Sequence, residues 1–106
     1  MKIVDILTYA LESGASDLHL STGSIPMVRI NGIMKPLNMK ATSNGDIDDL
    51  MPQVMKDEQI KRFREDKEID FSAKLDGIGR FRVIFFNQLN RLAGVFRTIP
   101  EVIRSF

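Results

Sequence analysis

The sequence contains no cysteine, which excludes a disulfide framework and any metal site built on thiolate ligands. Its single histidine leaves little for a zinc site, which usually takes three or four side-chain ligands. Long apolar runs are also missing, since no stretch approaches the roughly 20 residues of a membrane-spanning helix. Met1–Asp5 carries an acid where a signal peptide would begin its apolar run. We therefore expect a cytoplasmic protein without direct membrane insertion.

A phosphate-binding loop is absent as well. No segment matches Gly-x-x-x-x-Gly-Lys followed by Ser or Thr, in which backbone N–H groups cradle phosphates and the Lys neutralises them. The turn Gly77-Ile78-Gly79 lacks the strand, turn and helix context of a dinucleotide site. We therefore expect no ATPase activity from this chain alone.

Neither sign of charge is in excess. The 15 basic and 14 acidic residues give a formal net charge of +1, so no strong field favours nucleic acid. The basic string Lys61-Arg62-Phe63-Arg64 lies among acids such as Glu58 and Glu65, which indicates a solvated helix face. The 106 residues, 43% of them apolar, are enough for one domain with its own core.

The first third of the chain is predicted to hold one helix and three strands. Apolar residues recur at helical spacing over residues 3–11, and Gly14 is placed to end this helix in a left-handed conformation. Residues 17–20 alternate as in a strand. Asn31-Gly32 is a strong hairpin signal and joins strands at residues 27–30 and 33–37, with Pro36 at a strand end or a free edge.

The remaining chain is predicted to hold two helices and three strands. Ser43 or Asp46 caps a helix over residues 47–55, which Pro52 is expected to kink or divide. The other predicted elements are a helix over 56–67, strands at 69–75, 81–85 and 92–99, and turns at 76–79 and 87–90. Clustered antiparallel strands with helices packed over them indicate an α+β domain.

Asp17 and His19 share one face of the first predicted strand. One histidine with one carboxylate does not make a metal site, and no nucleophile signature accompanies them. The pattern indicates a polar strand face on which the imidazole is hydrogen-bonded or exposed.

Three arginines are the strongest candidates for chemistry. Arg80 and Arg82 alternate with apolar residues, so both point to one face of their strand. The turn at 87–90 makes the next strand antiparallel and brings Arg97 close to one of them. Guanidinium groups gathered in this way repel one another unless an anion lies between them, and Arg binds phosphate in a bidentate way. The alternative, which the residues alone favour, is a solvated face or ion pairs with Asp70, Asp76 or Glu68.

Three strings carry a resemblance to a known family. They are Gly14-Ala15-Ser16-Asp17-Leu18-His19-Leu20, Gly79-Arg80-Phe81-Arg82-Val83 and Val95-Phe96-Arg97-Thr98-Ile99-Pro100. Together they resemble the N-terminal domain of the PilT-like retraction ATPases of twitching motility, members of the secretion-ATPase superfamily. Phe86-Asn87-Gln88 followed by Arg91 is similar to the same branch, whereas Arg91-Leu92-Ala93-Gly94 departs from a turn that is often richer in glycine.

The resemblance implies a PAS-like antiparallel sheet of about six strands with helices packed on one side. It implies an N-terminal domain over residues 1–100, with 101–106 as the start of a linker to a downstream RecA-like ATPase core. ATP and Mg²⁺ would be cofactors of the full-length protein, and none is expected on this chain alone. The partners would be its own core, the neighbouring subunits of a homohexamer and the pilus machinery at the inner membrane.

The resemblance also implies roles for the arginines. In this superfamily, arginines of the N-terminal domain close over the phosphates of ATP bound to the core, and the matching positions are Arg82 and Arg97. Arg80 is a third candidate, since its string belongs to the retraction branch. The chain would then be a regulatory, nucleotide-closing domain of a motor that powers pilus retraction.

Two other functions stay open at this point. One is a stand-alone PAS-like module that senses a ligand held between sheet and helices, and the other is an adaptor that docks through its arginine-bearing face. A cavity in the core would favour the first. Partner binding through Arg82 and Arg97 without any dependence on ATP would favour the second.

Overall fold

The computed structural model describes residues 2–99, and these form a six-stranded antiparallel sheet with three helices. The strand order is β3-β2-β1-β6-β5-β4. The helices are α1 (Ile3–Glu12), α2 (Asn44–Val54) and α3 (Asp57–Asp66), and the strands are β1 (Asp17–Ser21), β2 (Met27–Ile30), β3 (Ile33–Pro36), β4 (Glu68–Leu75), β5 (Gly79–Gln88) and β6 (Arg91–Thr98). The predicted α+β class is confirmed, whereas the predicted linker at 101–106 lies outside the described residues.

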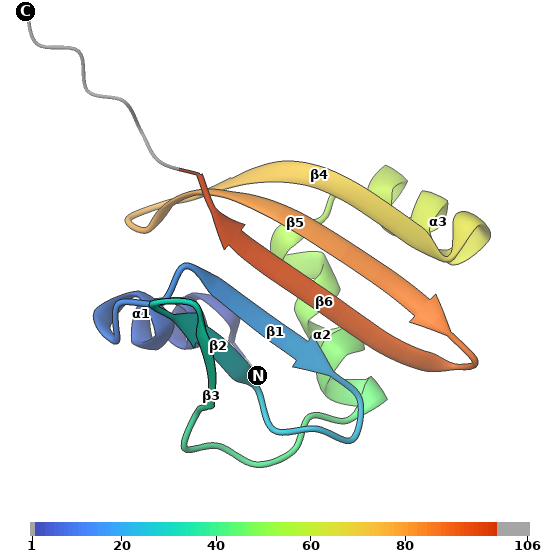
Figure 1. Cartoon of the computed structure of the whole chain (residues 1–106). Coiled ribbons are helices and arrows are strands. Elements are labelled where there is room, and N and C mark those ends of the chain that lie inside the picture. Colours follow the sequence, from blue (N-terminus) through green and yellow to red (C-terminus); the bar gives the residue numbers. More distant parts are fainter. Residues whose placement is uncertain (1, 100–106) are drawn as a thin grey trace, which may run out of the picture.

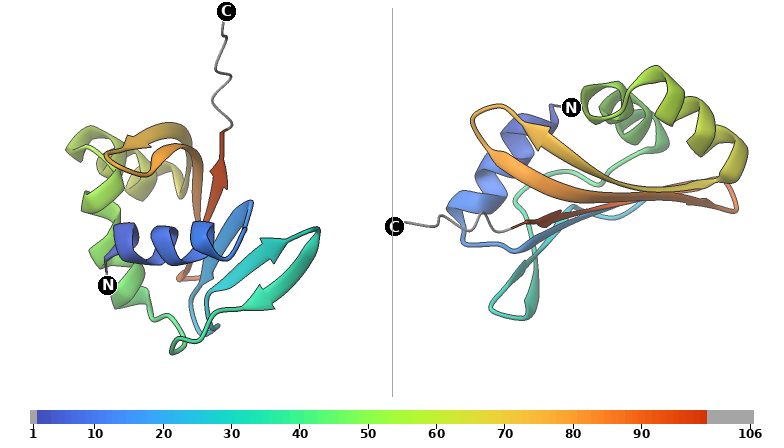
Figure 2. Two further views of the ribbon diagram at one scale, coloured as in Figure 1. Left: turned by 90° about the vertical axis from the view of Figure 1, so that its left-hand side faces the viewer. Right: turned by 90° about the horizontal axis from the view of Figure 1, so that it is seen from above.

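All the helices of the described part lie on one face of the sheet. Figure 1 looks onto the opposite, open face, and Figure 2 shows the helices together on one side, with the β2–β3 hairpin bending away from them. This is the two-layer arrangement that the PAS-like expectation required. Within residues 2–99, no helix is long and apolar enough to cross a membrane.

The core lies between this helix layer and the sheet, and alternation along the strands fills it. On β5, Phe81, Val83 and Phe85 are at most 2% exposed, while the residues between them point to the open face. The ring of Phe85 makes edge-to-face contacts with Phe63 of α3 and Phe96 of β6. The same alternation therefore leaves the arginines of β5 outside the core.

Residues with positive φ make the turns between strands. Asn31 and Gly32 have φ angles of 52° and 79°, as the hairpin prediction requires. Leu89 and Asn90, at 52° and 62°, form the β5–β6 turn. The predicted turn at 87–90 was therefore too long, and Arg91–Gly94 lies in strand β6 rather than in the hairpin turn. The segment Arg91–Gly94, which departs from the glycine-rich turn of the family, therefore belongs to a strand that is paired with β5.

Helix α2 shows how local capping determines where a helix begins. The side chain of Ser43 accepts a hydrogen bond from the backbone N–H of Asp46, and the carboxylate of Asp46 accepts one from Ser43, so the two form a capping box. The helix starts at Asn44 and runs through Pro52 to Val54, so Pro52 does not divide it, and the other part of the expectation, a kink at Pro52, stays a prediction. Pro52 lies in the last turn of α2, so only a short piece of helix follows the hydrogen bond that its missing N–H removes.

Candidate functional site

The open face of the sheet carries a transverse row of charged side chains. The strand register places Arg82 of β5 opposite Arg97 of β6, Arg97 opposite Asp17 of β1, and Asp17 opposite Arg29 of β2. We call these four residues the arginine row. The antiparallel pairing expected from the sequence is present, so residues far apart in the chain become direct neighbours on the face seen in Figure 1.

Arg80 lies beyond this row. It pairs with Lys74 of β4, and its carbonyl oxygen accepts a hydrogen bond from the backbone N–H of Ile99. The structure thus brings Arg82 and Arg97 together and leaves Arg80 two residues before Arg82, near the beginning of β5.

Arg82 is held by a carboxylate of the neighbouring strand. Its Nε donates to Oδ1 of Asp70 at 3.1 Å, and its Nη2 donates to Oδ2 at 2.6 Å. This fork is the bidentate geometry in which Arg also binds phosphate. Asp70 was one of the acids proposed from the sequence as an ion-pair partner, and that alternative is confirmed for Arg82.

Asp17 is the buried centre of the row. It is 6% exposed, and its Oδ2 lies 3.4 Å from Nη2 of Arg97, 3.5 Å from Nε of Arg29 and 3.6 Å from Nε2 of His19. A buried carboxylate is unfavourable unless cations or hydrogen bonds compensate it, and here three strands supply the compensation. Asp17 therefore lies between Arg97 and Arg29, and Asp70 pairs with Arg82 on the side away from Arg97, whereas no carboxylate lies between Arg82 and Arg97 themselves.

The electrostatics of the two carboxylates follow from these contacts. Burial acts to raise the pKa of Asp17, but the charge of Arg97, aided by hydrogen bonds and by His19, lowers the pKa below the ordinary 3.8. Hydrogen bonds from Arg82 lower the pKa of Asp70 and raise the pKa of Arg82. Both carboxylates are thus stabilised in their charged forms.

These shifts predict a loss of stability in acid. A carboxylate whose pKa is lower in the folded state binds more protons when unfolded, so its contribution is present above the unfolded value of about 3.9 and disappears as the pH falls through the folded value. We expect the melting temperature to fall below about pH 4, and to fall less steeply in the Asp17→Asn variant. Thermal denaturation by circular dichroism between pH 3 and 6 measures both slopes, and equal slopes would contradict a role for Asp17.

His19 differs in part from the sequence-based expectation. Its side chain is 31% exposed, yet its Nε2 is buried and makes no hydrogen bond. The expected hydrogen bond is replaced by the longer contact of Nε2 with the carboxylate of Asp17. Within the described residues, no group of three or more His, Cys, Asp or Glu side chains could hold a metal ion.

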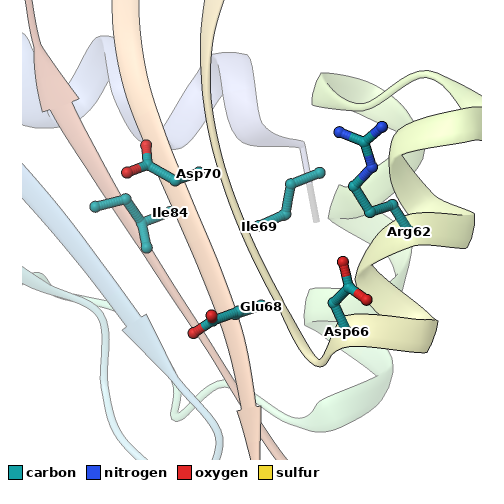
Figure 3. A pocket seen from close by; sticks show the side chains of 6 residues that line it. All are labelled: Arg62, Asp66, Glu68, Ile69, Asp70 and Ile84. Atoms are coloured by element: carbon teal, nitrogen blue, oxygen red, sulfur yellow. The ribbon is translucent and has the colours of Figure 1, made fainter.

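An open groove of about 490 Å³ lies beside the row, at the free edge of β4. Figure 3 shows Arg62 and Asp66 on α3, with Ile69 of β4 pointing toward that helix and Asp70 and Ile84 on the other side of the strand. Glu68 adds a third carboxylate to the lining. The excess of carboxylates makes this groove unfavourable for phosphate.

The pocket between α1 and the sheet bears on the ligand-sensing alternative. It is lined by Leu7, Ala10, Phe81 and Phe96, among others, and its volume is about 10 Å³. That volume accommodates about one water molecule and no metabolite. The phenylalanines fill the core, so this pocket does not support a bound ligand.

Sequence reasoning missed two members of the row. Asp17 was interpreted as part of a polar strand entry, and Arg29 was not singled out. The alternation of β2, in which Arg29 shares a face with Met27, was the available signal, but the pairing of β1 with both β2 and β6 was needed to use it.

The chain is similar in sequence to proteins of twitching motility. It is 42% identical over 101 residues to the type IV pilus retraction ATPase PilT of Pseudomonas aeruginosa, a match that covers 95% of this chain and 29% of the relative. It is 39% identical over 80 residues to a twitching motility protein of Neisseria gonorrhoeae, which covers 76% of this chain and 21% of the relative. The chain therefore spans less than a third of these relatives. No family profile matches it.

Two solved structures share the fold of this chain. A crystal structure of the pilus retraction motor PilT with bound ADP superposes with a TM-score of 0.90 and 37% identity, over 98% of this chain and 31% of that one. The ATPase DotB of Legionella pneumophila superposes with a TM-score of 0.77 at 21% identity, over 92% of this chain and 28% of that one. The second likeness bears on the fold alone.

Proposed function

The chain is homologous to the N-terminal region of the PilT-like ATPases of twitching motility, and on this premise we propose that it is the nucleotide-closing domain of a retraction motor. The full-length protein would be a cytoplasmic homohexamer that hydrolyses ATP with Mg²⁺ at the inner-membrane pilus machine. Residues 1–100 would form the domain, and 101–106 would lead to a RecA-like core.

One observation carries this proposal: Arg82 and Arg97 stand directly opposite each other on the open face of the sheet. Their side chains are 55% and 60% exposed, so a second domain can reach both. Two always-charged forks side by side suit the oxygens of a polyphosphate. The solved PilT structure contains ADP, which supports a nucleotide as the source of that phosphate, and we take the nucleotide to be ATP bound on the core.

The mechanism that we propose is closure. ATP with its Mg²⁺ would bind to the core, and the N-terminal domain would rotate as a rigid body until Arg82 and Arg97 contact the phosphates, with Arg80 at the margin. Charge that develops on the γ-phosphate would then be stabilised by both guanidinium groups. Loss of that phosphate would release the domain, so that nucleotide state sets the domain orientation. Contacts with the core of the next subunit would carry the rotation around the ring.

Hydrolysis measurements test the proposal. We expect the purified 106-residue chain to show no ATP turnover, because it has no phosphate-binding loop. The full-length gene product should hydrolyse ATP in the presence of Mg²⁺ and encode Gly-x-x-x-x-Gly-Lys-[Ser/Thr] downstream of Phe106. Turnover by the chain that survives removal of contaminating ATPases would contradict the proposal, as would a full-length product without that loop.

A further inference from the structure

The two arginines of the row are held in different ways. Arg82 gives its Nε and Nη2 edge to both oxygens of Asp70. Arg97 makes one long contact, from Nη2 to Oδ2 of Asp17 at 3.4 Å. Since a guanidinium has five N–H donors, Arg97 keeps most of its donors available, whereas the best edge of Arg82 is already occupied.

The two carboxylates also differ in their surroundings. Asp70 lies on the edge strand β4, and its side chain is 46% exposed. Rotation of that side chain alone would take it off Arg82. Asp17 lies on β1 between β2 and β6, is 6% exposed, and contacts Arg29 and His19 as well as Arg97. An incoming anion can therefore displace Asp70, but it cannot take the place of Asp17.

We infer that the two carboxylates have opposite effects on the affinity of the arginines for phosphate. Asp70 occupies the fork of Arg82 and must leave before phosphate binds there, so it weakens binding. Asp17 tethers Arg97 on the sheet face while its other donors engage the ligand, so it strengthens binding. The inference rests on the proposed function, because that function makes phosphate the ligand of the row.

Glu68 offers a matched control for Asp70. It lies on the same strand and the same face, two residues away, and its cross-strand partner is Phe86, whereas the fork of Arg82 binds Asp70. Asp70→Asn and Glu68→Gln change the net charge equally. A difference between them therefore measures the occupied fork and not the overall field of the domain.

The test is a titration of the purified chain with inorganic tripolyphosphate at constant ionic strength. The arginine Nε–H resonances report binding. We expect Asp70→Asn to bind about two- to fivefold more tightly than the wild type, since it removes an exposed competing ion pair. Glu68→Gln should show a clearly smaller gain. If the two variants gained the same affinity for tripolyphosphate, the change in net charge alone would explain the gain, and the proposed role of Asp70 would be overturned.

The tether is tested in the same titration. We expect Asp17→Asn to bind about tenfold more weakly, because Arg97 loses the group that orients it. Thermal denaturation establishes whether that variant is folded. If it is not, Asp17→Glu carries the test, since it keeps the charge but shifts it by one methylene and should also bind more weakly. Tighter binding by Asp17→Asn, or wild-type affinity in folded Asp17→Glu, would overturn the tether.

The titration needs no hydrolysis, so its outcome is separate from that of the proposed function. A full-length protein without ATPase activity would refute the motor and leave the order of anion affinities intact. Conversely, an active motor that depends on Arg82 and Arg97, with all variants binding tripolyphosphate alike or not at all, would refute the two positioning roles only.

Discussion

If the proposed function holds, replacement of Arg97 by glutamine in the full-length protein is expected to lower the kcat of ATP hydrolysis by at least about a hundredfold. Arg97 is 60% exposed, and the single contact with Asp17 leaves its other donors available to a phosphate brought by the core. An arginine that meets developing charge on a transferred phosphoryl group acts in the transition state, so its loss reduces kcat more than it changes KM. Steady-state hydrolysis at saturating and limiting ATP separates the two constants.

Arg91 provides the control for this experiment. It lies on the same strand and the same face as Arg97, six residues away, which along a strand is about 20 Å. Arg91→Gln removes the same charge and is expected to leave kcat unchanged. The adaptor alternative would replace the proposed function if two results were found together. The Arg97→Gln variant would keep full ATPase activity, and it would lose the binding of a partner protein that the wild type binds in the absence of ATP.

Substitution of Gly94 by valine is expected to destabilise the domain by about 1–3 kcal/mol. Gly94 pairs with Phe85 across β5 and β6, and a Cβ atom built on Gly94 would lie 2.8 Å from Cε1 of that ring. Edge-to-face contacts with Phe63 and Phe96 hold the ring, so it has little freedom to move aside. Glycine is required here because of this close approach rather than because of backbone conformation.

Chemical denaturation measures this loss, and two variants make it specific. Ala93→Val adds volume at the preceding position, which faces the open side of the sheet, and should change the stability by less than about 0.5 kcal/mol. Phe85→Leu alone creates a cavity, but combined with Gly94→Val it should cost less than the sum of the two changes. Additive losses would contradict a direct conflict between the ring and the added side chain.

Strand β5 shows which structural features could be predicted from the sequence. Alternation of Phe81, Arg82 and Val83 predicts which side chains face the core, because the side-chain period of a strand is two. Turn chemistry worked for Asn31-Gly32, since both residues tolerate positive φ. It was less exact for the β5–β6 turn, where Leu89 adopts positive φ without being a typical turn residue.

The candidate site was predictable only in part. The antiparallel hairpin of β5 and β6 is local in sequence, so the turn predicted that Arg97 lies close to Arg80 or Arg82, and the observed register selects Arg82. Asp17 is 80 residues from Arg97, and their contact depends on β1 pairing with β6 at the centre of the sheet. No local pattern encodes that pairing, since it is selected by the burial of a whole face of the sheet under the helices.

By itself, the sequence determined the α+β class, most of the helices and strands, the faces of the strands and the family to which the chain is homologous. Each of these depends on short-range periodicity, turn residues or short strings. The tertiary structure decided which carboxylate holds which arginine, that Pro52 remains inside its helix, and that the space beneath α1 is too small for a ligand. Those outcomes depend on strand order and close packing, where residues far apart in the chain compete for the same space and the same charge.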